Sequence, residues 1–163
     1  MKSPRNDPLL LAGKAMTVVM QGVMAIGAAA VAVTLPFVTV LSGDFVKGFA
    51  DGARLPIENL PAAPAAALLA ILFVMLAALF VFFGKLRAII ATVGEGDPFV
   101  PANARRLERM AWLLLAAQLL VWPALFCASF LADWAEDIEG LNLDVTGDGI
   151  SLTGLLMVLV LFI

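Results

Sequence analysis

The sequence predicts an all-α integral membrane protein, a single membrane domain over residues 1–163 in which four transmembrane helices form a bundle and a short extracytoplasmic hairpin precedes the last helix. Hydrophobic residues make up 63% of the chain and charged residues only 14%, whereas soluble domains have about 45–50% apolar and about 25% charged residues. The mean hydropathy is +1.03. A soluble fold of this size would lack the charge to cover its surface, so lipid must cover part of it.

The first predicted span covers residues 15–41. At about 1.5 Å per residue it would give about 40 Å of helix, enough to cross a hydrocarbon core of about 30 Å with tilt. Residues 1–14 resemble the basic region of a signal peptide, and residues 28–30 are small enough for a cleavage site. The apolar run continues well beyond that point, which favours an uncleaved signal anchor over a removed peptide.

The second and third predicted spans cover residues 65–83 and 111–131. The second is almost entirely Ala, Leu, Ile, Val, Met and Phe and stops at Gly84, a residue suited to ending a helix. The third has Trp112 and Trp134 near its two ends, where interfacial indoles are expected.

Two connecting segments are predicted to lie outside the cytoplasm. Residues 42–64 are polar and interrupted by proline and glycine, and residues 133–150 carry six acids and no base. The second half of the acidic segment alternates in polarity around a Gly-Asp-Gly turn, which predicts the hairpin.

Residues 152–163 would make only about 18 Å of helix, so we expect them to begin a fourth span that continues beyond this chain. A re-entrant or interfacial segment is the alternative.

The segment between the second and third spans, residues 85–110, is the most polar-patterned part of the chain. Its pattern indicates a helical continuation over residues 85–93, a turn containing Pro98, and a second helix that Asn103 would cap. Both halves have apolar residues at helical spacing and charges on other faces. Both halves are therefore predicted to be amphipathic and could lie along the membrane surface.

The distribution of bases predicts the orientation. Eight of the ten Lys and Arg residues fall in residues 1–14 and 85–110, while the predicted outer segments hold two. An excess of Lys and Arg marks the cytoplasmic side. Four spans would then place both termini in the cytoplasm.

The residue types inside the predicted spans disfavour several functions. None of the spans contains Asp, Glu, Lys, Arg or His, the usual marks of ion and proton pathways. The chain has no His and no Tyr and offers no nucleophile–base pair, so we expect no enzyme activity. The acidic segment lacks the ligand spacing of a calcium loop, and no phosphate loop is present. We expect no cofactor and no metal.

The polar and small residues within the spans are expected to serve helix packing. Gln21 and Gln118 could each hydrogen-bond across a helix interface. Small residues on one face of the first span would allow a neighbouring helix to approach closely. These small residues are Gly22, Ala25, Ala29 and Ala32.

One segment has a distinctive sequence motif: an Ile-rich helix end, Gly-Asp-Pro-Phe, an Asn a few residues later, and a basic helix that leads into the third span. These positions are Ile89, Ile90, Gly96, Asp97, Pro98, Phe99, Asn103, Arg106 and Leu107. The element resembles a family of bacterial four-helix inner-membrane proteins called domain of unknown function 2975. The predicted span layout and hairpin are also similar to that family, and members usually continue into a short charged tail after the fourth helix.

The resemblance implies no established activity, but it implies a partner. Family members are often encoded beside a small helix-turn-helix repressor, which suggests a membrane protein that holds or tunes a transcription regulator. The docking surface would then be residues 97–109, with Phe99 as the apolar anchor. Its contact residues would be Asp97, Pro98, Phe99, Asn103, Arg105, Arg106 and Arg109.

Other interpretations of the same residues stay open. Pro98 and its neighbours could simply form a rigid turn, with Phe99 inserted at the bilayer boundary and Asn103 capping the next helix. The three arginines fit anionic lipid headgroups better than nucleic acid.

We expect a non-enzymatic regulatory or interaction protein in the lipid bilayer, with no direct contact to nucleic acid. The alternative function is an accessory subunit of a larger membrane complex, and a weaker alternative is a small transporter or channel. The oligomeric state stays open.

Overall fold

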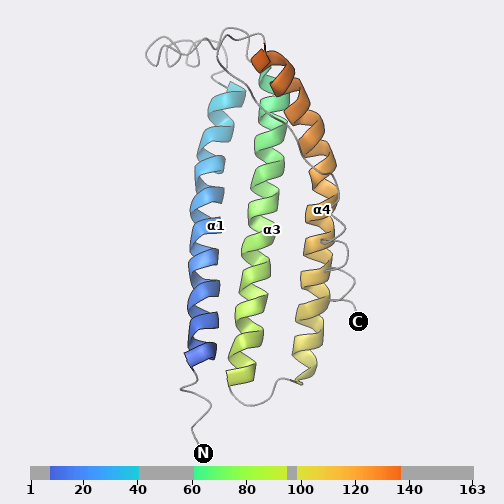
Figure 1. Ribbon diagram of the computed structural model, residues 1–163. Helices are drawn as coiled ribbons and strands as arrows, with labels where there is room; N and C mark the ends of the chain where they lie inside the picture. Colours follow the sequence, from blue (N-terminus) through green and yellow to red (C-terminus); the bar gives the residue numbers. More distant parts are fainter. Residues whose placement is uncertain (1–7, 41–60, 95–98, 137–163) are drawn as a thin grey trace, which may run out of the picture.

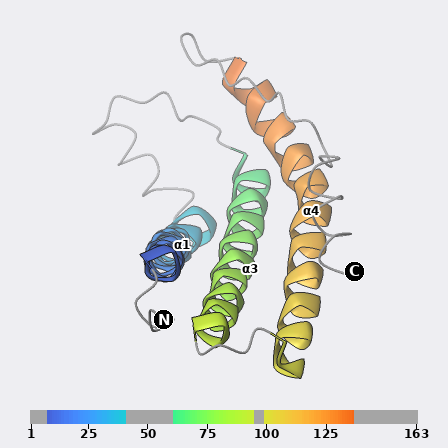
Figure 2. The same ribbon diagram turned by 60° about the horizontal axis from the view of Figure 1, so that its bottom comes forward.

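The computed structural model describes residues 8–40, 61–94 and 99–136 of the chain. This part consists of three α-helices, α1 (Pro8–Val40), α3 (Ala62–Gly94) and α4 (Pro101–Glu136). They run up, down and up, and α3 lies between α1 and α4 and packs against both (Figure 1). The N-terminal end of α1 therefore lies at the same end of the bundle as the C-terminal end of α3 and the start of α4 (Figure 2).

All three helices are long and apolar enough to cross a membrane, and the structure fits a multi-pass membrane protein. The predicted bundle of four is corrected, because the described residues contain three spans and no strand. The predicted fourth span, residues 152–163, and the predicted hairpin lie outside the described residues. Residues 133–136, which the sequence placed in the acidic connection, belong to the last turn of α4.

The two halves of the 85–110 segment are also corrected. Both halves are helical, but neither is a separate segment of the kind that could lie along the membrane surface. The structure makes residues 85–94 the continuous end of α3 and residues 101–110 the continuous start of α4 (Figure 1). The two long helices therefore extend to a common tip, and no separate surface helix lies between them in the described ranges.

Proline residues mark the starts of α3 and α4 and also occur inside α1 and α4. Pro101 is the first residue of α4, where the missing N–H is not needed, and Asn103 N donates to Val100 O at 2.9 Å in the same turn. α1 and α4 continue through Pro36 and Pro123. Helices in membranes tolerate such prolines because nearby groups satisfy the freed backbone.

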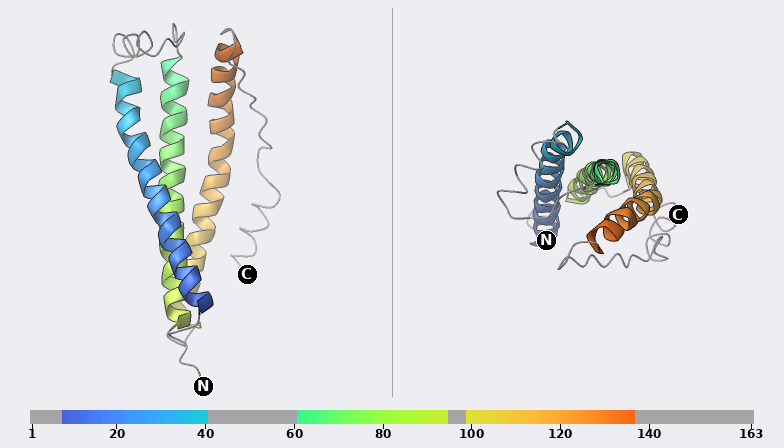
Figure 3. Two further views of the ribbon diagram at one scale, coloured as in Figure 1. Left: turned by 60° about the vertical axis from the view of Figure 1, so that its left-hand side comes forward. Right: turned by 90° about the horizontal axis from the view of Figure 1, so that it is seen from above.

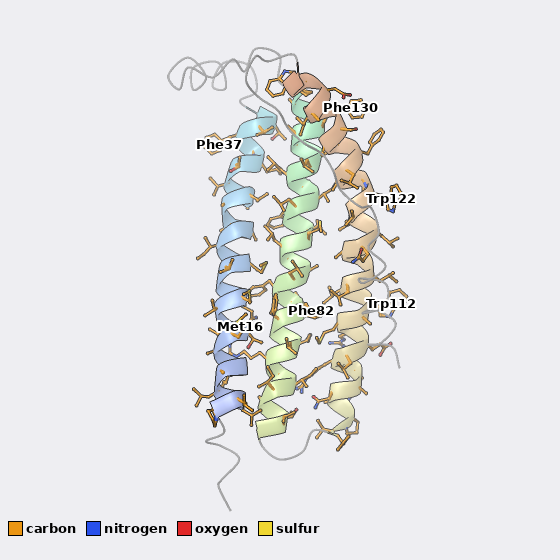
Figure 4. The ribbon with its side chains drawn as sticks, in the orientation of Figure 1. Met16, Phe37, Phe82, Trp112, Trp122 and Phe130 are labelled. Atoms are coloured by element: carbon orange, nitrogen blue, oxygen red, sulfur yellow. The ribbon has the colours of Figure 1, made fainter. Side chains whose placement is uncertain are left out.

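The bundle has little interior. Among the described apolar residues only Val31, Met110, Ala111 and Ala132 are buried, and many large apolar side chains are exposed along all three helices. Figure 4 shows Trp112, Trp122 and Phe130 pointing away from α3 on the outer side of α4. In a membrane protein such side chains face lipid or a neighbouring protein.

The contact between α1 and α3 follows a stripe of α1 other than the predicted small-residue face. A Cβ at Gly13 would lie 3.6 Å from Ile90 Cδ1, and one at Gly27 would lie 3.4 Å from Leu76 Cδ1. By contrast, nothing lies within 4 Å of the position that a Cβ would take at Gly22. The predicted face of small residues is exposed along its whole length. α3 therefore packs on glycines on the side of α1 opposite that face, since an α-helix turns about 100° per residue, and the two helices cross (Figure 3).

Candidate functional site at the tip of α3 and α4

The ends of α3 and α4 are joined by a hydrogen bond between two side chains. Asn103 Nδ2 donates to Thr92 Oγ1 at 2.8 Å, and the Thr92 hydroxyl in turn donates to Ile89 O at 2.7 Å. The Asn103 side chain is 5% exposed. A buried amide that bridges two helices fixes their relative position, because leaving either group unpaired would be costly.

Arg106 extends this connection. Its Nη1 donates to Asn103 Oδ1 at 2.7 Å and to Ala88 O at 3.2 Å. The guanidinium therefore contacts both the bridging amide and the backbone of α3. Charge-assisted hydrogen bonds of this kind are stronger than neutral ones. Thr92, Asn103 and Arg106 form what we refer to as the tip network.

Asn103 has a different position from the predicted one. α4 begins at Pro101, so Asn103 lies inside the first turn, and its side chain bridges to α3. Thr92 was not among the predicted site residues. A signal for it exists in the sequence, because the sequence predicts a turn between two helices at residues 94–101, and in an antiparallel helix pair joined there positions 92 and 103 would stand opposite each other.

The remaining predicted contact residues divide into two groups. Phe99 is 92% exposed at the tip, and Arg105 and Arg109 are exposed on α4. Asp97 and Pro98 lie outside the described residues. The structure thus presents one exposed aromatic ring and two exposed arginines on a hairpin that the tip network holds together.

Bases from all three helices lie at nearly one level below this tip. Gly13 packs against Ile90, and Arg106 bonds to Ala88, which aligns the helices along the bundle axis. The bases near these contacts span about 8 Å of helix length at about 1.5 Å per residue. This cationic belt consists of Lys14, Lys85, Arg87, Arg105, Arg106 and Arg109. Among the described residues at this level, Glu108 is the acid that accompanies it.

The two predicted glutamines have different surroundings. Gln21 Nε2 donates to Phe80 O in α3 at 3.5 Å and lies 3.1 Å from the position of a Cβ at Gly84. Gln21 therefore lies at the interface of α1 and α3. Gln118 is half-buried on α4.

Metal-ligating side chains do not gather in the part of the chain that the structure describes, where no three His, Cys, Asp or Glu residues could hold one ion. Cys127 is a free thiol on α4 and is half-buried. The arrangement at the tip offers surface recognition by an aromatic ring and fixed positive charge.

Comparison with known proteins found no family model, curated protein or solved structure that matches the chain. The resemblance to the domain of unknown function 2975 family therefore stays a prediction.

Proposed function

We propose that the chain is a non-enzymatic protein of the bacterial inner membrane that binds a cytoplasmic partner protein through the tip of α3 and α4. The observation that carries this proposal is the position of Phe99, which is 92% exposed beyond the cationic belt. The tip network below Phe99 holds the two helices that present it.

The position of the belt supports a tip that stands outside the bilayer. From Ala62 to Lys85 α3 provides about 35 Å of helix, which matches a hydrocarbon core of about 30 Å. Lys and Arg side chains gather where the hydrocarbon ends on the cytoplasmic side. From Lys85 to Gly94 α3 continues for about another 14 Å. This distance exceeds the headgroup layer, which is about 6 Å thick on each side.

This placement disfavours the alternative in which Phe99 inserts at the bilayer boundary. A phenyl ring beyond the headgroups would be exposed to water unless a protein covers it. Aromatic residues, phenylalanine included, and arginine are enriched at protein–protein interfaces. Phe99 with Arg105 and Arg109 would suit a partner that offers an apolar pocket beside acidic side chains.

The family resemblance supports the kind of partner. A small helix-turn-helix regulator held at the membrane would be removed from its DNA sites by binding the tip. Release from the tip would restore its access to DNA. This proposal assigns the protein no catalytic step and no contact of its own with nucleic acid.

The test is co-purification from native membranes after mild cross-linking, with wild type, Phe99→Ala and Arg105→Glu compared. We expect both variants to lose at least 80% of a cytoplasmic partner that wild type recovers. Leu9→Ala is the matched control, because Leu9 is an exposed apolar residue (80% exposed) at the same end of the bundle. A partner recovered equally by wild type and both tip variants, or no partner at all, would refute docking at the tip.

A second candidate, an accessory subunit of a membrane complex, is favoured by the open face of α1. A Cβ at Gly22 would have nothing within 4 Å, and Ala25 and Ala29 beside it are exposed. Small residues let two helices approach closely in lipid. This candidate predicts that Ala25→Leu removes a membrane-embedded partner that Phe99→Ala retains, and the same purification distinguishes the two.

A further inference from the structure

Two polar side chains lie in the middle of α4. The charged residues that flank its apolar part, Arg109 and Asp133, are about 36 Å apart along the helix at about 1.5 Å per residue. The midpoint of that distance is Val121. Trp122 is next to the midpoint, and Gln118 lies within about 5 Å of it along the axis. Both side chains are therefore at the depth where water is absent.

Neither polar group is satisfied within the part of the chain that the structure describes. There, no acceptor is within hydrogen-bond distance of the Trp122 indole N–H, and the Gln118 amide has no hydrogen-bond partner. Gln21 shows the contrast, because its amide donates to Phe80 O in α3. Polar groups at membrane depth need internal partners, since lipid offers none.

The two residues share a face that points away from the bundle. Residues four apart lie on one side of a helix, and Trp122 is 59% exposed while Gln118 is half-buried at its flank. Figure 4 shows Trp122 directed outward from α4. Phe126 continues this face at 66% exposure and packs edge-to-face on Phe130, with ring centroids 5.0 Å apart. Tryptophan ordinarily prefers the membrane interface, so an outward indole at mid-depth indicates a protein contact.

We propose that this face of α4 binds a second copy of the chain in the same orientation, with Gln118 and Trp122 at the centre of the contact. A carboxamide carries both donors and an acceptor, so two copies of Gln118 related by a twofold axis along the membrane normal can bond to each other reciprocally. They stand at equal depth by symmetry. The carboxamide oxygen has a second lone pair, which accepts the indole N–H of Trp122 from the other copy. Gln118 of the second copy thus provides a hydrogen-bond partner for both the Gln118 amide and the Trp122 indole. This inference does not rest on the function proposed above.

The contact is tested first by disulfide cross-linking in native membranes. In a Cys127→Ala background, Leu119→Cys on this face should give a cross-linked band at the mass of two chains under mild oxidation. Val74→Cys on α3 is the matched control, because it is exposed and at a similar depth from the belt, and it should stay monomeric. When two copies of the chain with different tags are expressed together, both tags must be detected in this band.

The second measurement is the dimerisation constant in lipid bilayers by energy transfer between labelled copies. Gln118→Leu should weaken it about threefold to thirtyfold, the range for polar contacts between membrane helices, and Gln118→Asn should weaken it less. Gln21→Leu is the control and should leave dimerisation unchanged. The proposal is overturned if wild type stays monomeric, if Gln118→Leu dimerises as well as wild type, or if Leu119→Cys cross-links to another protein or within its own chain.

Discussion

The side-chain amide of Asn103 donates to the Thr92 hydroxyl at 2.8 Å, across the gap between α4 and α3. The two residues are separated by eleven positions in the chain, and their contact closes the hairpin at the end that carries Phe99. The strength of this contact determines how well the tip is ordered.

A double-mutant cycle should measure this contact. Asn103→Leu should lower the free energy of unfolding by about 1–3 kcal/mol, because Thr92 and Arg106 both lose a partner. Thr92→Val preserves the shape and should lower it by about 1 kcal/mol. We expect the double variant to be more stable than the sum of the two effects predicts, by about 0.5 kcal/mol or more. Unfolding in bicelles provides the measurement, and strict additivity would contradict the assigned bond.

Substitutions at the adjacent residues Arg105 and Arg106 should separate an effect on stability from an effect on partner binding. Arg106→Gln should lower the free energy of unfolding by about 1–2 kcal/mol, since its guanidinium contacts Asn103 and the Ala88 carbonyl. Arg105→Gln should change it by less than about 0.5 kcal/mol, because Arg105 is exposed. Partner recovery should instead fall with Arg105→Gln. Equal destabilisation by both substitutions would argue against the tip network.

Two glycines of α1 should respond differently to a large side chain. Gly27→Leu should destabilise the bundle by about 1–3 kcal/mol, because a Cβ there already meets Leu76 at 3.4 Å and the rest of the side chain has no room. Gly22→Leu has open space and should be neutral or slightly stabilising, since leucine favours helix more than glycine does. Thermal unfolding in mild detergent compares the two. The reverse order would mean that α3 packs on the other face of α1.

Accessibility to a membrane-impermeant maleimide should report the proposed orientation. In a Cys127→Ala background, Phe99→Cys at the tip should react only after the cytoplasmic side is exposed. Ala63→Cys, exposed at the opposite end of α3, should react with intact cells whose outer membrane has been permeabilised. The opposite pattern would invert the topology and place the tip outside.

The helices themselves follow from composition. Three runs of Ala, Leu, Val and Phe without charge permit little other than membrane-length helices, and the structure has helices there. Their ends were harder to predict. Residues 85–93 and 102–110 have their own local amphipathic pattern, and a short window of sequence does not reveal that the helix axis continues through Gly84 or Met110. Unbroken backbone hydrogen bonding extended the spans.

Which face of α1 meets α3 could not be read from sequence. Gly22 and the alanines after it make one stripe of small residues, and Gly13 and Gly27, fourteen positions apart, lie on the opposite side of the helix. Both permit close approach. The choice depends on where α3 lies after the connection between them, and that is a property of the tertiary structure.

Thr92 shows a second reason why the site could not be fully predicted from the sequence. A lone threonine near a helix end usually bonds to its own preceding turn, and Thr92 does so at Ile89. Its second role, as acceptor for Asn103, appears only when the two helices are aligned. Predicting it requires the position of the turn as well as the residue type.

The extension of α3 beyond Lys85 has an electrostatic consequence. If the headgroup layer takes about 6 Å of the extension of about 14 Å, the tip stands about 8 Å above the lipid surface. That is about one Debye length at physiological ionic strength, so the negative potential of an anionic leaflet would have fallen to about a third there. An acidic protein could then approach Phe99 at the tip with little repulsion from the lipids beneath it.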